Sequence, residues 1–178
     1  MKSILFALSM ILVPALVIIP MAWSDDDDDH GRNATGVAAV SNPVYKAECG
    51  DCHMAYPPGL LPARSWQKLM SGLEDHFGDN AELDAKAQKA ITDYLVSNSA
   101  DKSDYRRSQR FAAGRGTPTR ISETAYFQHE HNEIPTRLVK GNKEVISFSN
   151  CNACHRKAEQ GSFKERDIVI PGFGPWDD

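Results

Sequence analysis

Apolar residues recur at helical spacing along two stretches in the first half of the chain. The first consists of Trp66, Leu69, Met70, Leu73 and Phe77, with His76 at its edge, and the second of Leu83, Ala87, Ala90, Ile91, Tyr94 and Leu95. Spacings of three and four residues place such side chains on one face of a helix. The pattern therefore predicts a helix over 66–77, capped by Ser65 and ended by Gly78, and another over about 81–97.

A shorter helix is predicted over 43–52, because Asn42-Pro43 is typical of an N-cap followed by proline at the first helical position. After Ser99 the periodicity is lost, and from Thr119 onward turn-forming residues dominate. The fold is expected to be mainly α. A three-helix N-terminal domain would occupy 42–100, and a loop-rich, largely irregular C-terminal domain would occupy 101–178.

The first 24 residues have the pattern of an export signal. Lys2 is followed by an almost wholly apolar run from Ile4 to Ile19, and Ala22-Trp23-Ser24 is typical of a cleavage site. The run is shorter than the roughly 20 residues of a spanning helix, although an uncleaved anchor is the alternative. We expect cleavage near Ser24 and a periplasmic location.

The residues that follow, 25–41, are expected to be an acidic, disordered N-terminus, because the charges of the unbroken run Asp25 to Asp29 repel one another. The whole chain carries a net charge of −4. This acidity argues against a nucleic-acid partner.

All four cysteines lie in two Cys-x-x-Cys-His motifs, Cys49-Gly50-Asp51-Cys52-His53 and Cys151-Asn152-Ala153-Cys154-His155. This pattern is typical of covalent haem c attachment, in which the thiols bind the vinyl groups and the histidine binds the iron. A zinc site, a redox-active dithiol or disulfides are alternatives, but none explains why histidine follows the second cysteine both times. We therefore predict two covalently bound haems, held by Cys49, Cys52, Cys151 and Cys154.

The second axial ligand decides what each iron can do, because an open position permits binding or turnover of small molecules. For the first iron the candidate is His76, although a histidine facing a core is often only packed there. No histidine or methionine follows His155, so the second iron must take its ligand from upstream, and we favour His131 over His129. Met70 on its apolar stripe is expected to be a core residue.

Five arginines lie between residues 101 and 120, namely Arg106, Arg107, Arg110, Arg115 and Arg120. They have two interpretations. The segment is a solvated linker, or some of the guanidinium groups pair with haem propionates.

The chain resembles the small periplasmic dihaem cytochromes c of the DHC type. The resemblance rests on both haem motifs, on Trp66…His76-Phe77-Gly78, on Arg120-Ile121…Phe127…His131 and on the tail from Gly161-Ser162-Phe163 to Pro171. It implies a first domain like class-I cytochromes and two six-coordinate irons, with His53 and His76 on one and His131 and His155 on the other. A crossed assignment of the distal histidines stays open.

This resemblance also implies transfer of electrons at low potential, to an oxygen-binding monohaem cytochrome c, with a membrane b-type cytochrome as the source. The sequence therefore predicts an electron carrier and not an enzyme. The alternative is a haem enzyme of peroxidase or reductase type, or a gas-binding sensor, with a displaceable distal histidine.

Overall fold

Residues 36–176 are described by the computed structural model of the chain; the predicted signal peptide and acidic run lie outside them. The described chain is mainly helical, in agreement with the sequence. Its α-helices are α1 (Pro43–Cys49), α2 (Ala63–Met70), α3 (Ala85–Ser97), α4 (Arg106–Ala112), α5 (Ala125–Glu130) and α6 (Cys151–Cys154). Among these residues, no helix has the length and apolar character needed to cross a membrane.

Short 3-10 helices and one hairpin complete the fold. The 3-10 helices are η1 (Pro58–Leu60), η2 (Leu73–Asp75), η3 (Ala100–Lys102), η4 (Ile121–Glu123), η5 (Thr136–Leu138), η6 (Ala158–Gln160) and η7 (Glu165–Asp167). Strands β1 (Val169–Ile170) and β2 (Gly174–Pro175) pair antiparallel, with Val169 opposite Pro175. Past α5 the regular elements are therefore short, as the turn-rich sequence indicates.

The three predicted helices of the first half exist, with different bounds. Helix α2 begins at Ala63, before its predicted start, and the predicted cap Ser65 is wrong because this residue is buried inside the helix. Asn42 caps α1 as expected, because its side chain accepts a hydrogen bond from the Tyr45 N–H at 2.9 Å. Helix α3 begins at Ala85 and not at residue 81, since the Asp84 carboxylate caps it through the N–H groups of Lys86 and Ala87.

Helix α2 ends at Met70, seven residues before its predicted end. Gly72 leaves the helical region of backbone conformation, and the next turn is the separate η2. Phe77 has a φ of 61°, which no right-handed helix contains. The apolar spacing therefore continues through residues 73–77 although the helix does not.

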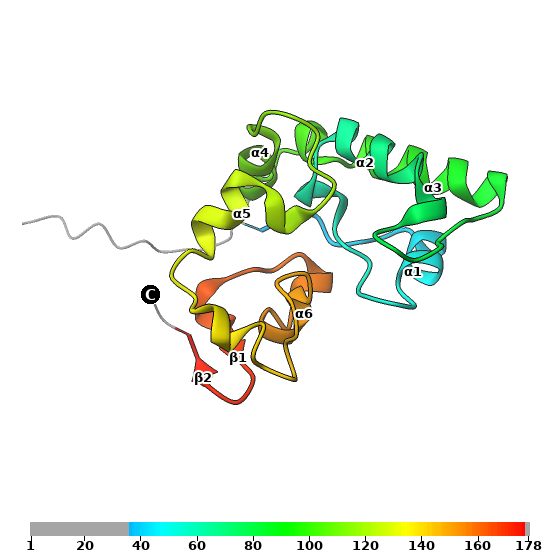
Figure 1. Ribbon diagram of the computed structural model, residues 1–178. Coiled ribbons are helices and arrows are strands. Elements are labelled where there is room, and N and C mark those ends of the chain that lie inside the picture. The colour runs from blue at the N-terminus through cyan, green and yellow to red at the C-terminus, as the bar shows by residue number, and fades with distance from the viewer. Residues whose placement is uncertain (1–35, 177–178) are drawn as a thin grey trace, which may run out of the picture.

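The segment expected to be a linker contains α4. Phe111 and Ser108 of this helix are buried, and α4 lies against η1 and η3. In Figure 1, α4 and α5 lie beside α2 and α3, whereas α6 and the hairpin form a lower part beneath α5. The linker interpretation is thus wrong for residues 106–112.

Two apolar clusters form the core. The first lies between α1, α2 and α3 and consists of Val40, Tyr45, Ala55, Leu61, Trp66, Met70, Leu73, Ile91 and Leu95. The second consists of Val37, Leu60, Ala100, Phe111 and Phe127, with Phe148 and Phe163 packed against it. Because the second cluster draws residues from both sides of position 100, the division into 42–100 and 101–178 stays a prediction.

Candidate functional site

The first motif continues directly from α1. Cys49 is the last residue of the helix, and the chain then turns to bring His53 beside Tyr56. Their ring centroids are 4.8 Å apart and their planes are inclined by 29°. The Nδ1 atom of His53 lies 2.8 Å from the Met54 carbonyl oxygen. A carbonyl only accepts, so Nδ1 carries the proton and donates, which leaves the Nε2 lone pair free for a metal.

His76 lies in a turn after η2, not on a helical stripe as the apolar spacing predicted. The turn is held by a hydrogen bond from the His76 N–H to the Asp79 carbonyl at 2.7 Å. A second bond runs from the Gly78 N–H to the Asp75 carboxylate at 3.0 Å. This turn faces the His76 ring toward His53, with 6.2 Å between the ring centroids.

That separation fits a metal held between two imidazoles. A metal–nitrogen bond is about 2 Å, and the ring centroid lies about 1 Å beyond the nitrogen, so two trans rings should stand about 6 Å apart. Burial, then the charges of His53 and Arg120, lower the pKa of His76. The neutral imidazole, which is the form that ligates metals, is thereby favoured. We call Cys49, Cys52, His53 and His76 the first site.

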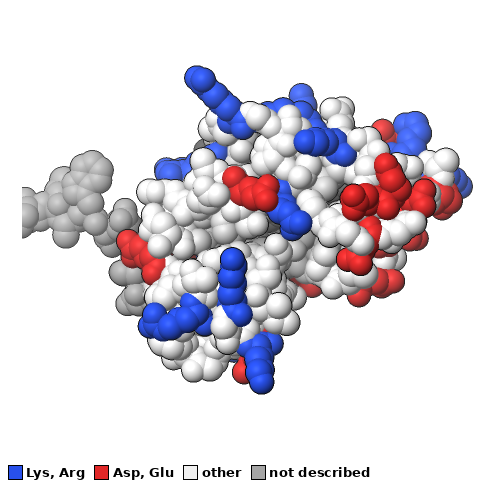
Figure 2. Space-filling view, viewed as in Figure 1, with Lys and Arg blue, Asp and Glu red and all other residues white. Residues whose placement is uncertain are grey.

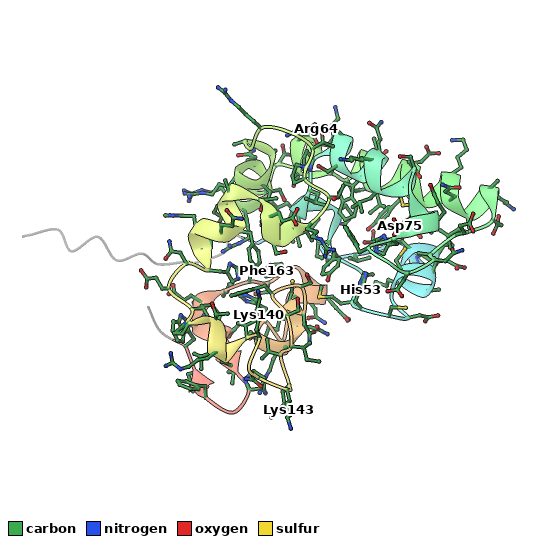
Figure 3. All side chains as sticks on the ribbon, in the orientation of Figure 1. His53, Arg64, Asp75, Lys140, Lys143 and Phe163 are labelled. Atoms are coloured by element: carbon green, nitrogen blue, oxygen red, sulfur yellow. The ribbon has the colours of Figure 1, made fainter. Side chains whose placement is uncertain are left out.

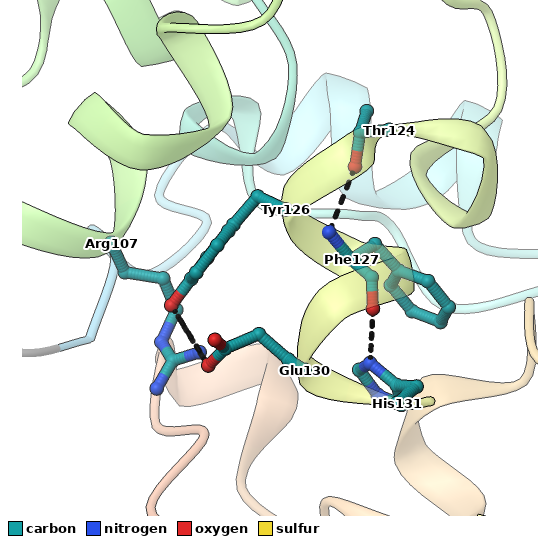
Figure 4. Close-up of polar contacts among 6 residues, drawn as sticks. All are labelled: Arg107, Thr124, Tyr126, Phe127, Glu130 and His131. Atoms are coloured by element: carbon teal, nitrogen blue, oxygen red, sulfur yellow. Dashed lines mark hydrogen bonds and ion pairs between the residues drawn. The ribbon is translucent and has the colours of Figure 1, made fainter. Parts of the chain in front are cut away.

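The second motif forms α6, a single helical turn, with His155 immediately after it. Opposite lies His131, at the end of α5. Thr124 caps this helix through the Phe127 N–H, and the Phe127 carbonyl accepts a hydrogen bond from Nδ1 of His131 at 2.8 Å (Figure 4). The His131 ring also stacks on Phe127 at 3.8 Å. Its Nε2 atom is again the one left for a metal.

The ring centroids of His131 and His155 are 6.1 Å apart, almost the same separation as that of His53 and His76. We call Cys151, Cys154, His131 and His155 the second site. These residues line a cavity of about 580 Å³, which is within the usual range of sites for small ligands and cofactors. Burial, then His131 and Arg107, lower the pKa of His155 to about 4.

Two aromatic rings complete the wall of this cavity. The ring centroid of Phe163 lies 5.2 Å from that of His155, and the ring centroid of Phe148 lies 6.0 Å from that of His131. Figure 3 labels His53 and Phe163, which mark the first and the second site. Within the described residues, the Nδ1 atom of His155 is buried without a hydrogen-bond partner.

The other candidate ligands have different surroundings. Met70 is buried in the first cluster, as its apolar stripe predicted. His129 is exposed on α5, at the edge of the large cavity that it also lines. His30 lies outside the described residues. None of the four cysteines forms a disulfide, and no cluster of three or more His, Cys, Asp or Glu suited to a metal occurs in residues 36–176. The zinc and disulfide alternatives therefore find no support in the described chain.

Two of the five arginines lie at the sites. Arg107 lines the large cavity and donates to the Tyr126 hydroxyl at 3.1 Å. Arg120 places its guanidinium carbon 3.8 Å from the centre of the Phe77 ring. It also lines a hollow of about 350 Å³ beside His131. Arg106, Arg110 and Arg115 are exposed.

Sequence reasoning missed Tyr56. Its ring covers His53, and its hydroxyl donates to the Ser149 carbonyl at 2.6 Å, two residues before Cys151. Tyr56 therefore contacts both His53 at the first site and the segment that leads into the second motif. Arg120 likewise contacts Phe77 beside the first site and lines the hollow beside His131. The two sites are neighbours in space. Only the position of Tyr56, three residues after His53, hinted at such a role.

The chain is similar to proteins of known family and structure. The family model described as dihaem cytochrome c matches residues 45–163. A diheme cytochrome c from Shewanella baltica OS155 is 46% identical, with a TM-score of 0.66 over 76% of this chain and 98% of that one. A diheme cytochrome c from Rhodobacter sphaeroides is 44% identical, with a TM-score of 0.64 over 71% of this chain and 100% of that one. No curated protein matches the chain.

Proposed function

Because the chain belongs to the dihaem cytochrome c family, and is therefore an electron-transfer protein with two covalently bound haems, we propose that it carries electrons at low potential through two bis-histidine haems. Cys49 and Cys52 would hold the first haem, and Cys151 and Cys154 the second. His53 with His76, and His131 with His155, would be the axial ligands. When bound, each haem supplies an iron that alternates between the ferric and ferrous states.

The observation that carries this proposal is the matched spacing of the two histidine pairs, 6.2 and 6.1 Å between ring centroids. Main-chain carbonyls fix the orientation of His53 and His131 through Nδ1. Histidine rings held by these hydrogen bonds would stay in place when the iron changes its charge. Two nitrogen ligands also favour a lower reduction potential than histidine with methionine.

Arg107 and Arg120 are proposed as partners of haem propionates. Each lines a hollow at the second site, and Arg120 also touches Phe77 beside the first. A guanidinium group binds a carboxylate through two parallel hydrogen bonds. The exposed Arg106, Arg110 and Arg115 are not needed for this role.

We propose that the protein is a carrier and has no catalytic site, because two histidines held by each iron would leave no position for a substrate. Its place would be the periplasm, after cleavage near Ser24. An oxygen-binding monohaem cytochrome c would be the acceptor and a membrane b-type cytochrome the source. These proposals rest on the pattern of residues 1–24 and on the family resemblance.

Spin-state spectroscopy of the purified holoprotein tests the proposal. We expect two low-spin haems in both oxidation states, no near-infrared sulfur-to-iron band and no rapid binding of carbon monoxide by the reduced protein. A five-coordinate iron at rest, or stoichiometric uptake of carbon monoxide, would instead favour the enzyme or sensor alternative.

A further inference from the structure

The charges of the described chain are divided between its two halves. Residues 42–100 carry eight Asp or Glu against five Lys or Arg, whereas residues 101–176 carry nine against 13. The net charges are therefore −3 and +4. In Figure 2 the acidic side chains gather on the right, over the region of α1 and α3, and basic ones cover the lower left.

The acidic charge is concentrated at the first site. Glu74, Asp75 and Asp79 belong to the turn that presents His76, and Asp51 lies two residues before His53. We call these four residues the acidic rim. All four are exposed. Arg120 is a cation beside His76. It is already engaged with Phe77 and, at 3.6 Å, with Glu123.

The turn that carries three of these residues also carries an apolar residue in an unusual conformation. Phe77 is 45% exposed, and its φ of 61° is rare for a bulky side chain. The turn that imposes this φ holds the Phe77 ring 4.8 Å from the ring of His76. An exposed aromatic residue with polar and charged neighbours is typical of a protein docking surface.

We propose that the acidic rim with Phe77 is the docking surface for a redox partner whose own cofactor edge is surrounded by lysine and arginine. This inference rests on the proposed carrier function and names the kind of partner. Complementary charges raise the rate of encounter and orient the two proteins. The second site lies in the cavity of the more basic half and would exchange electrons through the first.

The test uses the holoprotein and a basic monohaem cytochrome c, with the rate constant of electron transfer measured by stopped flow against ionic strength. The rim variant is Glu74→Lys/Asp79→Lys, which spares Asp75 because its carboxylate holds the turn. A milder variant is Glu74→Gln/Asp79→Asn. The matched control is Glu144→Lys/Glu159→Lys, which changes the net charge equally at exposed positions of the other half.

We expect the rate at low salt to fall about tenfold in the lysine variant, less in the neutral variant, and little in the control, with the differences vanishing at high salt. Equal losses in the rim variant and the control would overturn the docking surface, since net charge would then be the cause. No loss in any variant would overturn it as well.

Reduction by a small uncharged mediator separates this proposal from the carrier function. If the protein cycles normally with the mediator, but its electron-transfer rate with the cytochrome does not depend on the rim residues, the docking surface alone is rejected. Failure to cycle with the mediator would reject the carrier function, whatever the rim variants do.

Discussion

His129 and His131 lie two residues apart, but their surroundings differ in a way that favours His131 as the ligand. His131 follows the last residue of α5, stacks on Phe127 and donates from Nδ1 to its carbonyl. His129 is exposed within the helix. The spacing of the two histidines left both open as ligands, because the direction of each ring depends on where α5 ends.

We therefore expect His131→Ala to convert one of the two haems to a high-spin state, because the ring centroid of His131 stands 6.1 Å from that of His155. His129→Ala should leave both haems low-spin and serves as the control. Electron paramagnetic resonance of the oxidised protein measures the result. A high-spin signal from His129→Ala alone would show that the wrong distal residue was chosen.

Tyr56 makes two separable contacts, a ring stack on His53 and a hydrogen bond to Ser149. Burial, then the neighbouring Cys151, raises the pKa of its hydroxyl to about 12, so it remains a donor at neutral pH. Tyr56→Phe keeps the stack and removes the bond, which should lower the free energy of unfolding by about 1 kcal/mol. Denaturant titration measures this loss.

The low-spin spectrum of Tyr56→Phe should stay unchanged, because the ring that covers His53 remains. Tyr56→Ala, which removes both contacts, should alter the signal of the first haem as well as the stability. If Tyr56→Phe were as stable as the unchanged protein, the bond to Ser149 would not contribute to holding the two sites together.

At the scale of elements, the sequence predicted which helices exist better than where they begin and end. Apolar spacing identified α2 and α3, and the pair Asn42-Pro43 identified α1. The capping residues were harder to see. Helix α2 begins after Pro62, which has no side-chain cap, and the Ala63 N–H donates instead to the Asp101 carboxylate at 2.8 Å. A cap that lies 38 residues away in the chain leaves no local pattern.

Asp101 also accepts a hydrogen bond from the Ser99 hydroxyl at 2.7 Å. Partial burial alone would raise the pKa of its carboxyl, but these hydrogen bonds outweigh burial and lower the pKa below the ordinary value. A depressed pKa means that the ionised group stabilises the fold above its unfolded value of about 3.9. This contribution is lost as the pH falls through the folded pKa.

The variant Asp101→Asn keeps an acceptor oxygen but carries no charge. We expect it to be less stable at pH 6 by less than about 1 kcal/mol, because the site is largely exposed to solvent. The difference should shrink as the pH is lowered below about 4 and then disappear. Unfolding by denaturant at several pH values measures it, and a difference independent of pH would show that charge has no part in the cap.

At the scale of the whole molecule, contacts between distant segments hold the two sites together. The Val37 N–H donates to the Gly161 carbonyl at 3.0 Å, and Tyr56 reaches Ser149 across 93 residues. The sequence predicted the chemistry of both sites, since each motif is local. It could not predict how the two sites adjoin, because contacts between residues far apart in the chain produce no regular spacing in the sequence. Residues 36–41, part of the segment expected to be acidic and disordered, contribute the buried Val37 and Val40.

Gly161 tests this arrangement most directly. It has a φ of 78°, and a Cβ atom there would lie 2.0 Å from the Val37 carbonyl oxygen, a contact with backbone that cannot turn away. Gly172 has a similar φ of 72°, but a Cβ there would meet nothing within 4 Å. The two glycines therefore share the cost of a left-handed conformation, and only Gly161 adds the close approach.

We expect Gly172→Ala to lose about 1–2 kcal/mol of stability from its conformation alone. Gly161→Ala should lose about 1–3 kcal/mol more, as overpacking does. Because residues 36–41 contact both core clusters, helical circular dichroism and haem absorption should report one unfolding transition that shifts as a unit. Separate transitions in Gly161→Ala, with only the second haem affected, would mean that the halves fold independently. Equal losses of stability in the two variants would mean that the Val37 backbone moves away from the added Cβ atom without loss of stability.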